Sequence, residues 1–298
     1  MLSAQTLYWL LSEPSIFTLL TGLVISLSVG SFLNVVIYRL PVMMEREWQA
    51  MTAPADTVEG SAGIAKNQEQ EPFNLAVPAS RCGNCGHRIR WYENIPVLSY
   101  VALRGRCSGC NEKISLRYPS IELLTGILGA FIAWHFGLGL AGISMLLLTW
   151  TLVALTFIDI DHQLLPDRLT LPLMWLGLLL NTQELFTSLE HAVIGAAAGY
   201  LVLWSVYWLF KLLTGKEGMG YGDFKLLAAI GAWGGFEVLP LTILLSSVVG
   251  VVLALLLMAA KRHQAANPLP FGPYLAIAGW IALIWGEQIN GWYLGMLL

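Results

Sequence analysis

The sequence predicts an all-α polytopic membrane protein with about eight transmembrane helices and a small cytoplasmic zinc-binding module. Composition is the first reason: 56% of the 298 residues are hydrophobic and 12% are charged, with a mean hydropathy of +0.66. This hydrophobic content and mean hydropathy exceed those of soluble or disordered chains. The second is a series of apolar runs of roughly 20 residues, the length needed to cross about 30 Å of hydrocarbon. The third is a pair of C-x-x-C motifs in the one long polar segment.

The apolar runs, in chain order, predict eight helices: 16–38, 119–136, 140–158, 169–186, 192–210, 224–240, 241–260 and 271–289. Only the stretch Gly234 to Glu237 and Pro240 separate the sixth helix from the seventh, so a seven-helix count stays open. The first run is interpreted as a retained helix, because a secretory signal would carry basic residues before it and here Arg39 follows it.

Basic residues predict the orientation, because short loops rich in Lys and Arg stay in the cytoplasm. With eight helices, all 16 Lys and Arg residues fall on one side of the membrane. We therefore expect both chain ends outside, and the cytoplasmic segments to be 39–118, 159–168, 211–225 and 261–270.

Three parts follow from this organisation: a first transmembrane helix (1–38), a cytoplasmic zinc-binding domain (39–118) and a multi-helix membrane domain (119–298). Within the second part, residues 51–80 are rich in Ala, Pro, Glu, Gln and Gly and contain almost no aromatic residues. Such a composition is typical of a flexible insertion.

All four cysteines lie in the two C-x-x-C pairs, Cys82 with Cys85 and Cys107 with Cys110. Two such pairs supply the four sulfur ligands that a structural zinc ion prefers. Two disulfides are the alternative, but the orientation places the segment in the reducing cytosol, where disulfides rarely persist. Four cysteines leave no open coordination position, so the zinc is expected to be structural rather than catalytic.

Acidic residues gather where predicted membrane helices meet the cytoplasmic side. Asp159, Asp161 and Asp167 follow the third helix, and Asp223 follows three nearby glycines at the start of the sixth. Asp159 continues an apolar run without a turn signal, so we expect it at membrane depth, where acids are costly and mark function. Asp167 is equally well explained as the N-cap of the following helix.

Two facing carboxylates share a proton, so that one serves as a base towards water and the other as an acid towards the leaving amine. Asp159 and Asp223 fit this arrangement, although spacing alone does not exclude Asp161. Glycine-rich loops also bind phosphates, but the stretch before Asp223 lacks the Gly-Lys-Ser/Thr ending of a P-loop.

Six motifs, in this order, give the chain a resemblance to the type IV prepilin peptidases, which are bifunctional leader peptidases and N-methyltransferases of the bacterial inner membrane. They are G-S-F-L-N-V-V-I-Y-R-L-P (30–41), the double C-x-x-C, R-Y-P-S-I-E (117–122), D-I-D-H-Q-L-L-P-D (159–167), G-Y-G-D-F-K (220–225) and P-F-G-P-Y-L (270–275). The resemblance implies a catalytic dyad of Asp159 and Asp223 that cleaves prepilins or pseudopilins after a glycine.

The resemblance also implies S-adenosylmethionine as the donor that methylates the new N-terminus, although no residues are predicted to bind it. The implied surroundings are the lipid bilayer, with no nucleic-acid partner. Glu122 is a further buried acid, expected to orient substrate, pair with Arg117 or Arg39, or anchor the helix. A proton-coupled transporter with a regulatory zinc module is the alternative function; we detect no internal repeat of the kind transporters often show.

Overall fold

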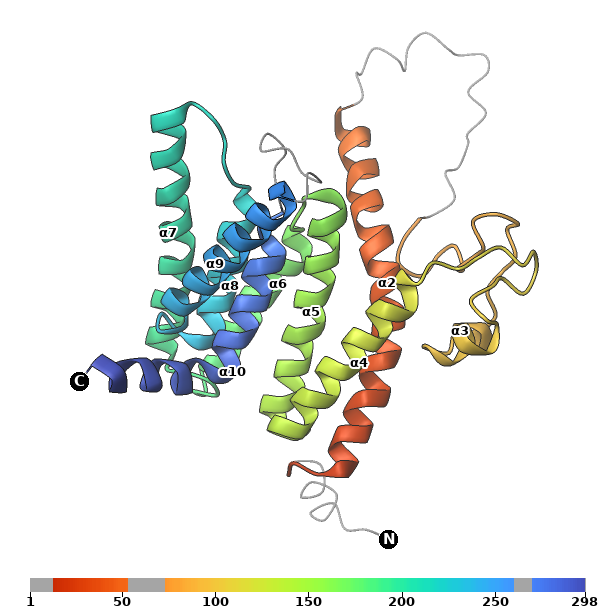
Figure 1. Ribbon diagram of the computed structural model, residues 1–298, viewed down its shortest axis with the longest axis horizontal. Helices are drawn as coiled ribbons and strands as arrows, with labels where there is room; N and C mark the ends of the chain where they lie inside the picture. Colours follow the sequence, from red (N-terminus) through yellow and green to blue (C-terminus); the bar gives the residue numbers. More distant parts are fainter. Residues whose placement is uncertain (1–12, 53–72, 260–269, 298) are drawn as a thin grey trace. The chain divides into compact units, whose positions relative to one another are not determined.

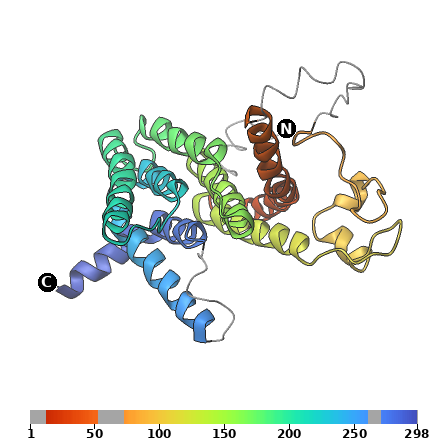
Figure 2. The ribbon, with the colours of Figure 1, turned by 90° about the horizontal axis from the view of Figure 1, so that it is seen from above.

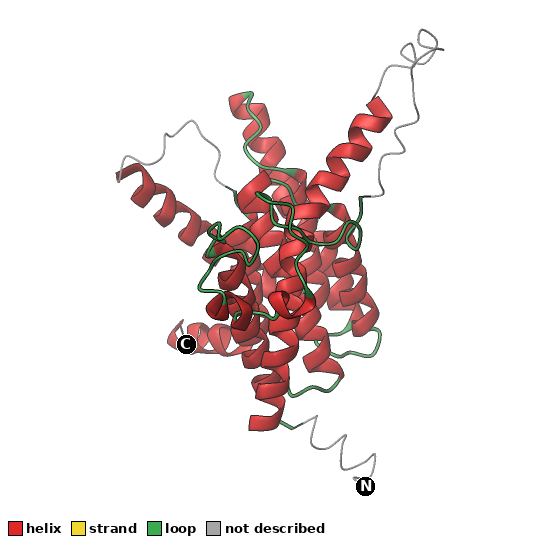
Figure 3. Cartoon of the chain, turned by 90° about the vertical axis from the view of Figure 1, so that its right-hand side faces the viewer, coloured by secondary structure: helices red, strands yellow, loops and turns green. Residues whose placement is uncertain are grey.

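A computed structural model describes residues 13–52, 73–259 and 270–297 of the chain. This part is helical, with no β-strand and only two isolated bridges (Figure 3). The all-α prediction is therefore confirmed. The chain divides into two compact units, Met1–His135 and Phe136–Leu298.

The first unit contains two long helices, α2 (Ile16–Thr52) and α4 (Arg117–Phe136), together with the short η2 (Trp91–Asn94) and α3 (Leu98–Ala102) (Figure 1). α2 continues well beyond residue 38, where its apolar run was predicted to end. Met, Glu, Arg and Gln, which favour helices, follow the run. Hydropathy predicted the apolar part of this helix and missed its polar extension.

Small residues line the contact between α2 and α4. A Cβ atom added to Gly22 would lie 2.3 Å from Cβ of Ala133, and one added to Gly129 would lie 1.8 Å from Oγ of Ser26. Such small side chains let two membrane helices approach closely, so that packing replaces the hydrophobic effect that lipid cannot supply.

Part of the predicted flexible insertion (51–80) packs on α2. Arg39, buried in this helix, donates hydrogen bonds to the carbonyl oxygens of Asn74 (2.8 Å) and Pro78 (2.6 Å). The guanidinium carbon of Arg46 lies over the ring of Phe73, 4.2 Å from the ring centroid. Residues 73–80 are thus anchored, while residues 53–72 of the insertion lie outside the described part of the chain.

Six helices form the second unit: α5 (Leu140–His162), α6 (Asp167–Asn181), α7 (Leu189–Thr214), α8 (Tyr221–Gly234), α9 (Val238–Ala259) and α10 (Gly272–Leu297). α8 ends at Gly234 and α9 begins at Val238, so the sixth and seventh predicted helices are separate. Among the described helices, five are long and apolar enough to cross a membrane: α2, α4, α5, α7 and α9. α6 and α8 have 15 and 14 residues.

α8 forms the core of the second unit, and it packs against α7, α6 and α10 (Figures 1 and 2). Its residues from Leu226 to Trp233 are buried. α7 contributes the sequence G-A-A-A-G (195–199), and a Cβ added to Gly195 would lie 2.4 Å from the carbonyl oxygen of Gly231. Glycine on both helices therefore brings the two backbones into contact.

Polar side chains hold the C-terminal end of α8 against α6. Asn181 is fully buried; its amide donates to the carbonyl oxygens of Ala232 (2.9 Å) and Trp233 (3.0 Å). Its side-chain oxygen accepts from the main-chain N–H groups of Phe186 and Thr187. This one side chain satisfies carbonyls at the end of α8, which otherwise lack helical partners.

Candidate metal centre and candidate active site

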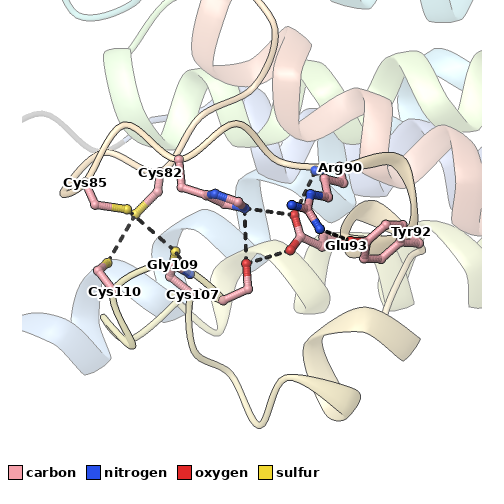
Figure 4. Close-up of polar contacts among 10 residues, drawn as sticks. Cys82, Cys85, Arg90, Tyr92, Glu93, Cys107, Gly109 and Cys110 are labelled. Carbon is pink, nitrogen blue, oxygen red and sulfur yellow. Dashed lines mark hydrogen bonds and ion pairs between the residues drawn. The ribbon is translucent and has the colours of Figure 1, made fainter.

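The four cysteines converge on one point in the first unit. Their Sγ atoms all lie within 4.8 Å of one another, and all four thiols are free (Figure 4). The Sγ atoms are 3.9 Å apart for Cys82 and Cys110, and 4.0 Å apart for Cys85 and Cys107. Four sulfurs at about 2.3 Å from a tetrahedral zinc ion are about 3.8 Å apart, so this donor set fits zinc.

Two equivalent turns present the sulfurs. In the first, the N–H of Cys82 donates to the carbonyl of His87; in the second, Cys107 donates to Glu112, both at 2.9 Å. A left-handed residue closes each turn, Gly86 (φ 71°) in one and Asn111 (φ 59°) in the other. Gly and Asn tolerate this conformation best, which explains locally how each C-x-x-C motif folds.

A polar cluster supports the cysteine site. Nε2 of His87 lies 3.1 Å from Oε2 of Glu93 and 3.1 Å from Oγ of Ser108. Glu93 also accepts from the main-chain N–H of Arg90 at 2.8 Å and from Ser108 at 2.6 Å, which lowers the pKa of its carboxyl to about 2 (Figure 4). His87 is thus bound to the carboxylate of Glu93 and to Ser108, beside the four cysteines.

In the second unit, Asp159 lies in the last turn of α5. Its side chain is buried, with 5% of the residue exposed. Oδ2 accepts a hydrogen bond from the main-chain N–H of Gly272 at 3.0 Å. α5 thus continues to His162, four residues beyond the predicted end of this helix at residue 158.

Asp223 lies in the first turn of α8 and is 7% exposed. Its main-chain N–H donates to the carbonyl of Gly220 at 3.2 Å, which starts the helix directly after the glycine-rich loop. Asp159 of α5 lies within electrostatic range of the Asp223 carboxyl, so α5 and α8 place the two acids near each other.

Leu165, in the loop between α5 and α6, packs against the glycines beside both acids. A Cβ added to Gly222 would lie 2.7 Å from Cβ of Leu165, and one added to Gly272 would lie 3.1 Å from its Cδ2. Leu165 is buried. One buried apolar side chain therefore lies beside both acids, and its low polarity strengthens the interaction between their charges.

The other acids of the cluster point elsewhere. Asp161 is exposed, because two residues along a helix place its side chain on the face away from Asp159. Asp167 is not the N-cap of α6, as one interpretation had it; Pro166 holds that position. Its carboxylate instead binds Nζ of Lys225, at 2.6 Å from Oδ1 and 2.7 Å from Oδ2.

Glu122, in α4, has a partner that the sequence did not indicate. Its Oε2 accepts from the main-chain N–H of Val97 at 2.8 Å. Val97 has a φ of 60°, which is rare for a β-branched residue. Arg39, one of the two arginines that Glu122 was predicted to pair with, donates instead to the carbonyl oxygens of Asn74 and Pro78.

Sequence reasoning missed three contacts: Gly272 with Asp159, Lys225 with Asp167, and Val97 with Glu122. Each joins residues far apart in the chain, so no local pattern indicated them. The only available signal was that Gly272 and Lys225 stand inside two of the six motifs, P-F-G-P-Y-L and G-Y-G-D-F-K.

Two protein families match the chain. Residues 24–136 match the bacterial peptidase A24 N-terminal domain, and residues 146–255 match the type IV leader peptidase family. No solved structure matches the chain at a significant level.

Curated relatives match over nearly the full length. The protein named prepilin leader peptidase/N-methyltransferase from Stutzerimonas stutzeri is 58% identical over 291 residues, which is 96% of each chain. A protein of the same name from Pseudomonas aeruginosa is 56% identical over 96% of both chains. Another from Aeromonas hydrophila is 58% identical over 90% of this chain and 91% of the relative. The chain therefore belongs to the type IV leader peptidase family.

Proposed function

We propose that this protein is a bifunctional membrane enzyme that removes the leader of type IV prepilins or pseudopilins and methylates the new N-terminal residue. The relatives named for both activities, similar over almost their whole length, support the pair of reactions. The observation that supports Asp159 and Asp223 as the catalytic pair is that both acids are buried and lie within electrostatic range of each other. No observation favours the transporter alternative.

The dyad hydrolyses the peptide bond after the leader glycine without a metal. One carboxylate accepts a proton from a water molecule, whose oxygen attacks the scissile carbonyl carbon. The partner carboxyl donates its proton to the carbonyl oxygen, which gives a neutral tetrahedral gem-diol. When the gem-diol collapses, one of its hydroxyl protons returns to the partner carboxylate, and the amine leaves with the proton that the water gave up. Each acid thus reverses its own proton transfer, and the pair returns to its starting state with one shared proton.

The location of the acids suits a substrate that combines a basic leader with an apolar helix. Asp159 ends a helix able to cross the membrane, so the dyad lies at a membrane boundary. A positively charged leader is attracted to acids at that boundary, while the apolar helix stays in the lipid.

The arrangement in the bacterial inner membrane is part of this proposal. Eight membrane helices, namely α2 and α4 to α10, would place every Lys and Arg on the cytoplasmic side and both chain ends outside. The short α8 is enclosed by its neighbours, whereas α6 exposes Leu171, Trp175 and Leu179 on one side. A fused alkaline phosphatase, which is active only outside the cytoplasm, should be active at residue 298 and inactive after Thr214.

Cys82, Cys85, Cys107 and Cys110 would hold a structural zinc ion, which fixes the fold of the module. S-adenosylmethionine supplies the methyl group in the second reaction. No glycine-rich strand–helix turn of the dinucleotide-binding kind occurs in the sequence, so we assign no residues to the donor.

Both activities can be followed with one synthetic prepilin peptide and detergent-purified protein. Mass spectrometry should show loss of the leader in every sample and the addition of one methyl group only when S-adenosylmethionine is present. An intact peptide after incubation with folded protein would contradict the peptidase assignment.

A further inference from the structure

The first residue of α10 touches a carboxylate of the dyad. Gly272 donates its main-chain N–H to Oδ2 of Asp159 at 3.0 Å, in a buried position. The first N–H groups of a helix have no helical acceptor, so they are free to bind a group from another element. Here the acceptor comes from α5, 113 residues earlier in the chain.

A side chain at position 272 would not fit. An added Cβ would lie 2.7 Å from Oδ2 of Asp159 and 3.1 Å from Cδ2 of Leu165. The first distance is shorter than the Cβ contacts found in real structures. Leu165 is buried between Gly272, which binds Asp159, and Gly222, which precedes Asp223. Glycine is needed here for close approach.

We propose that Gly272 is a positioning residue of the peptidase: its N–H holds Oδ2 of Asp159 and directs the other oxygen of that carboxylate towards water and Asp223. The inference rests on the proposed function. An N–H donor at a helix start stabilises a carboxylate more than a neutral carboxyl group. Asp159 is therefore the ionised base at the start of the reaction, and Asp223 is the protonated acid.

The groups around Asp159 are consistent with this division. Asp223 on α8 and Tyr274 on α10 both lie within electrostatic range of Asp159, and neither carries a positive charge. The nearby Lys225 is bound to Asp167. Asp161 and His162 follow Asp159 on α5 and are exposed. The Gly272 N–H is thus the donor that the described structure gives to Asp159.

The first test is Gly272→Ala, compared with Gly291→Ala in the same helix, where an added Cβ meets nothing within 4 Å. We expect Gly272→Ala to lower kcat for leader cleavage about tenfold or more and to leave KM nearly unchanged. The acidic limb of the pH–rate profile should move about one pH unit higher, because the carboxylate has lost a stabilising donor. Gly291→Ala should match the wild type.

A second variant removes the donor without adding bulk. Cell-free synthesis with glycolic acid at position 272 replaces the N–H by an ester oxygen, and the hydroxy acid of leucine at position 275 is its control. The N–H of Leu275 donates to the carbonyl of Phe271, within the helix start. The ester at 272 should shift the pH profile in the same direction as the alanine variant, and the ester at 275 should leave the profile in place.

A shifted acidic limb in both variants at position 272 supports the inference. A uniform loss of activity with an unmoved profile overturns it, since that result indicates a packing role. Wild-type kcat in both variants, with Asp159→Asn inactive, also overturns it and leaves the dyad intact. If Asp159→Asn cleaves normally as well, the proposed dyad itself fails.

Discussion

Lys225→Met tests how the ends of α5, α6 and α8 hold the two acids together. Lys225 follows Asp223 by two residues, and Asp167 begins α6 after the loop that leaves Asp159. The bidentate contact between Lys225 and Asp167 therefore closes a ring that contains both acids. Removing the ammonium group opens this ring.

The expected loss is large in catalysis and small in stability. The side chains are 27% and 53% exposed, so the ion pair contributes at most about 1 kcal/mol to the free energy of unfolding. A displacement of about 1 Å in a catalytic group, however, can reduce the rate about 100-fold. We expect Lys225→Met to reduce kcat for leader cleavage about tenfold or more, with KM nearly unchanged.

The assay is peptide cleavage under multiple turnover, with thermal unfolding of the same preparations. Lys216→Met is the matched control, because Lys216 is an exposed lysine in the loop before α8. The charge-reversed pair Asp167→Lys with Lys225→Asp should recover a large part of the lost rate. A kcat within twofold of wild type for Lys225→Met, or no recovery in the reversed pair, would refute the positioning argument.

Three further changes test the metal centre and the helix packing. Cys107→Ser should abolish stoichiometric zinc in the purified protein, measured by elemental analysis; unchanged zinc content would exclude the four-sulfur site. Asn181→Leu removes four hydrogen bonds, two of them buried and two partly buried, worth about 0.6 kcal/mol each in membrane proteins, so the free energy of unfolding should fall by about 2 kcal/mol. Gly195→Ala should cost about 1–3 kcal/mol by forcing α7 from α8, while Gly291→Ala should cost little.

The positions of the helices could be predicted from hydropathy, because a lipid environment demands long apolar runs. Helix ends were less predictable. α2 extends to Thr52 because its polar continuation still favours a helix, and α8 stops at Gly234 because Gly235 takes a positive-φ conformation (φ 79°, ψ −177°) that only glycine adopts readily. Hydropathy indicates which segments are apolar enough to lie in lipid, whereas the positions of helix ends depend on the residues at those ends.

The candidate sites were predictable where chemistry is concentrated in short motifs. The spacing of the cysteines indicated that their four sulfurs meet at one candidate metal site, and the isolated acids Asp159 and Asp223 indicated a candidate catalytic pair. What the spacing did not indicate was the choice of Asp159 over Asp161, which depends on which face of α5 is buried. The contacts of Gly272 and Lys225 depend likewise on tertiary packing between distant helices.

The most direct test of the dyad is leader cleavage by Asp159→Asn and Asp223→Asn, each purified separately and checked for zinc content and thermal unfolding. Each asparagine keeps the size of the side chain and removes the ability to exchange a proton. Both variants should fold, retain zinc and leave a prepilin peptide uncut. Cleavage at the wild-type rate by either variant would contradict the two-acid mechanism.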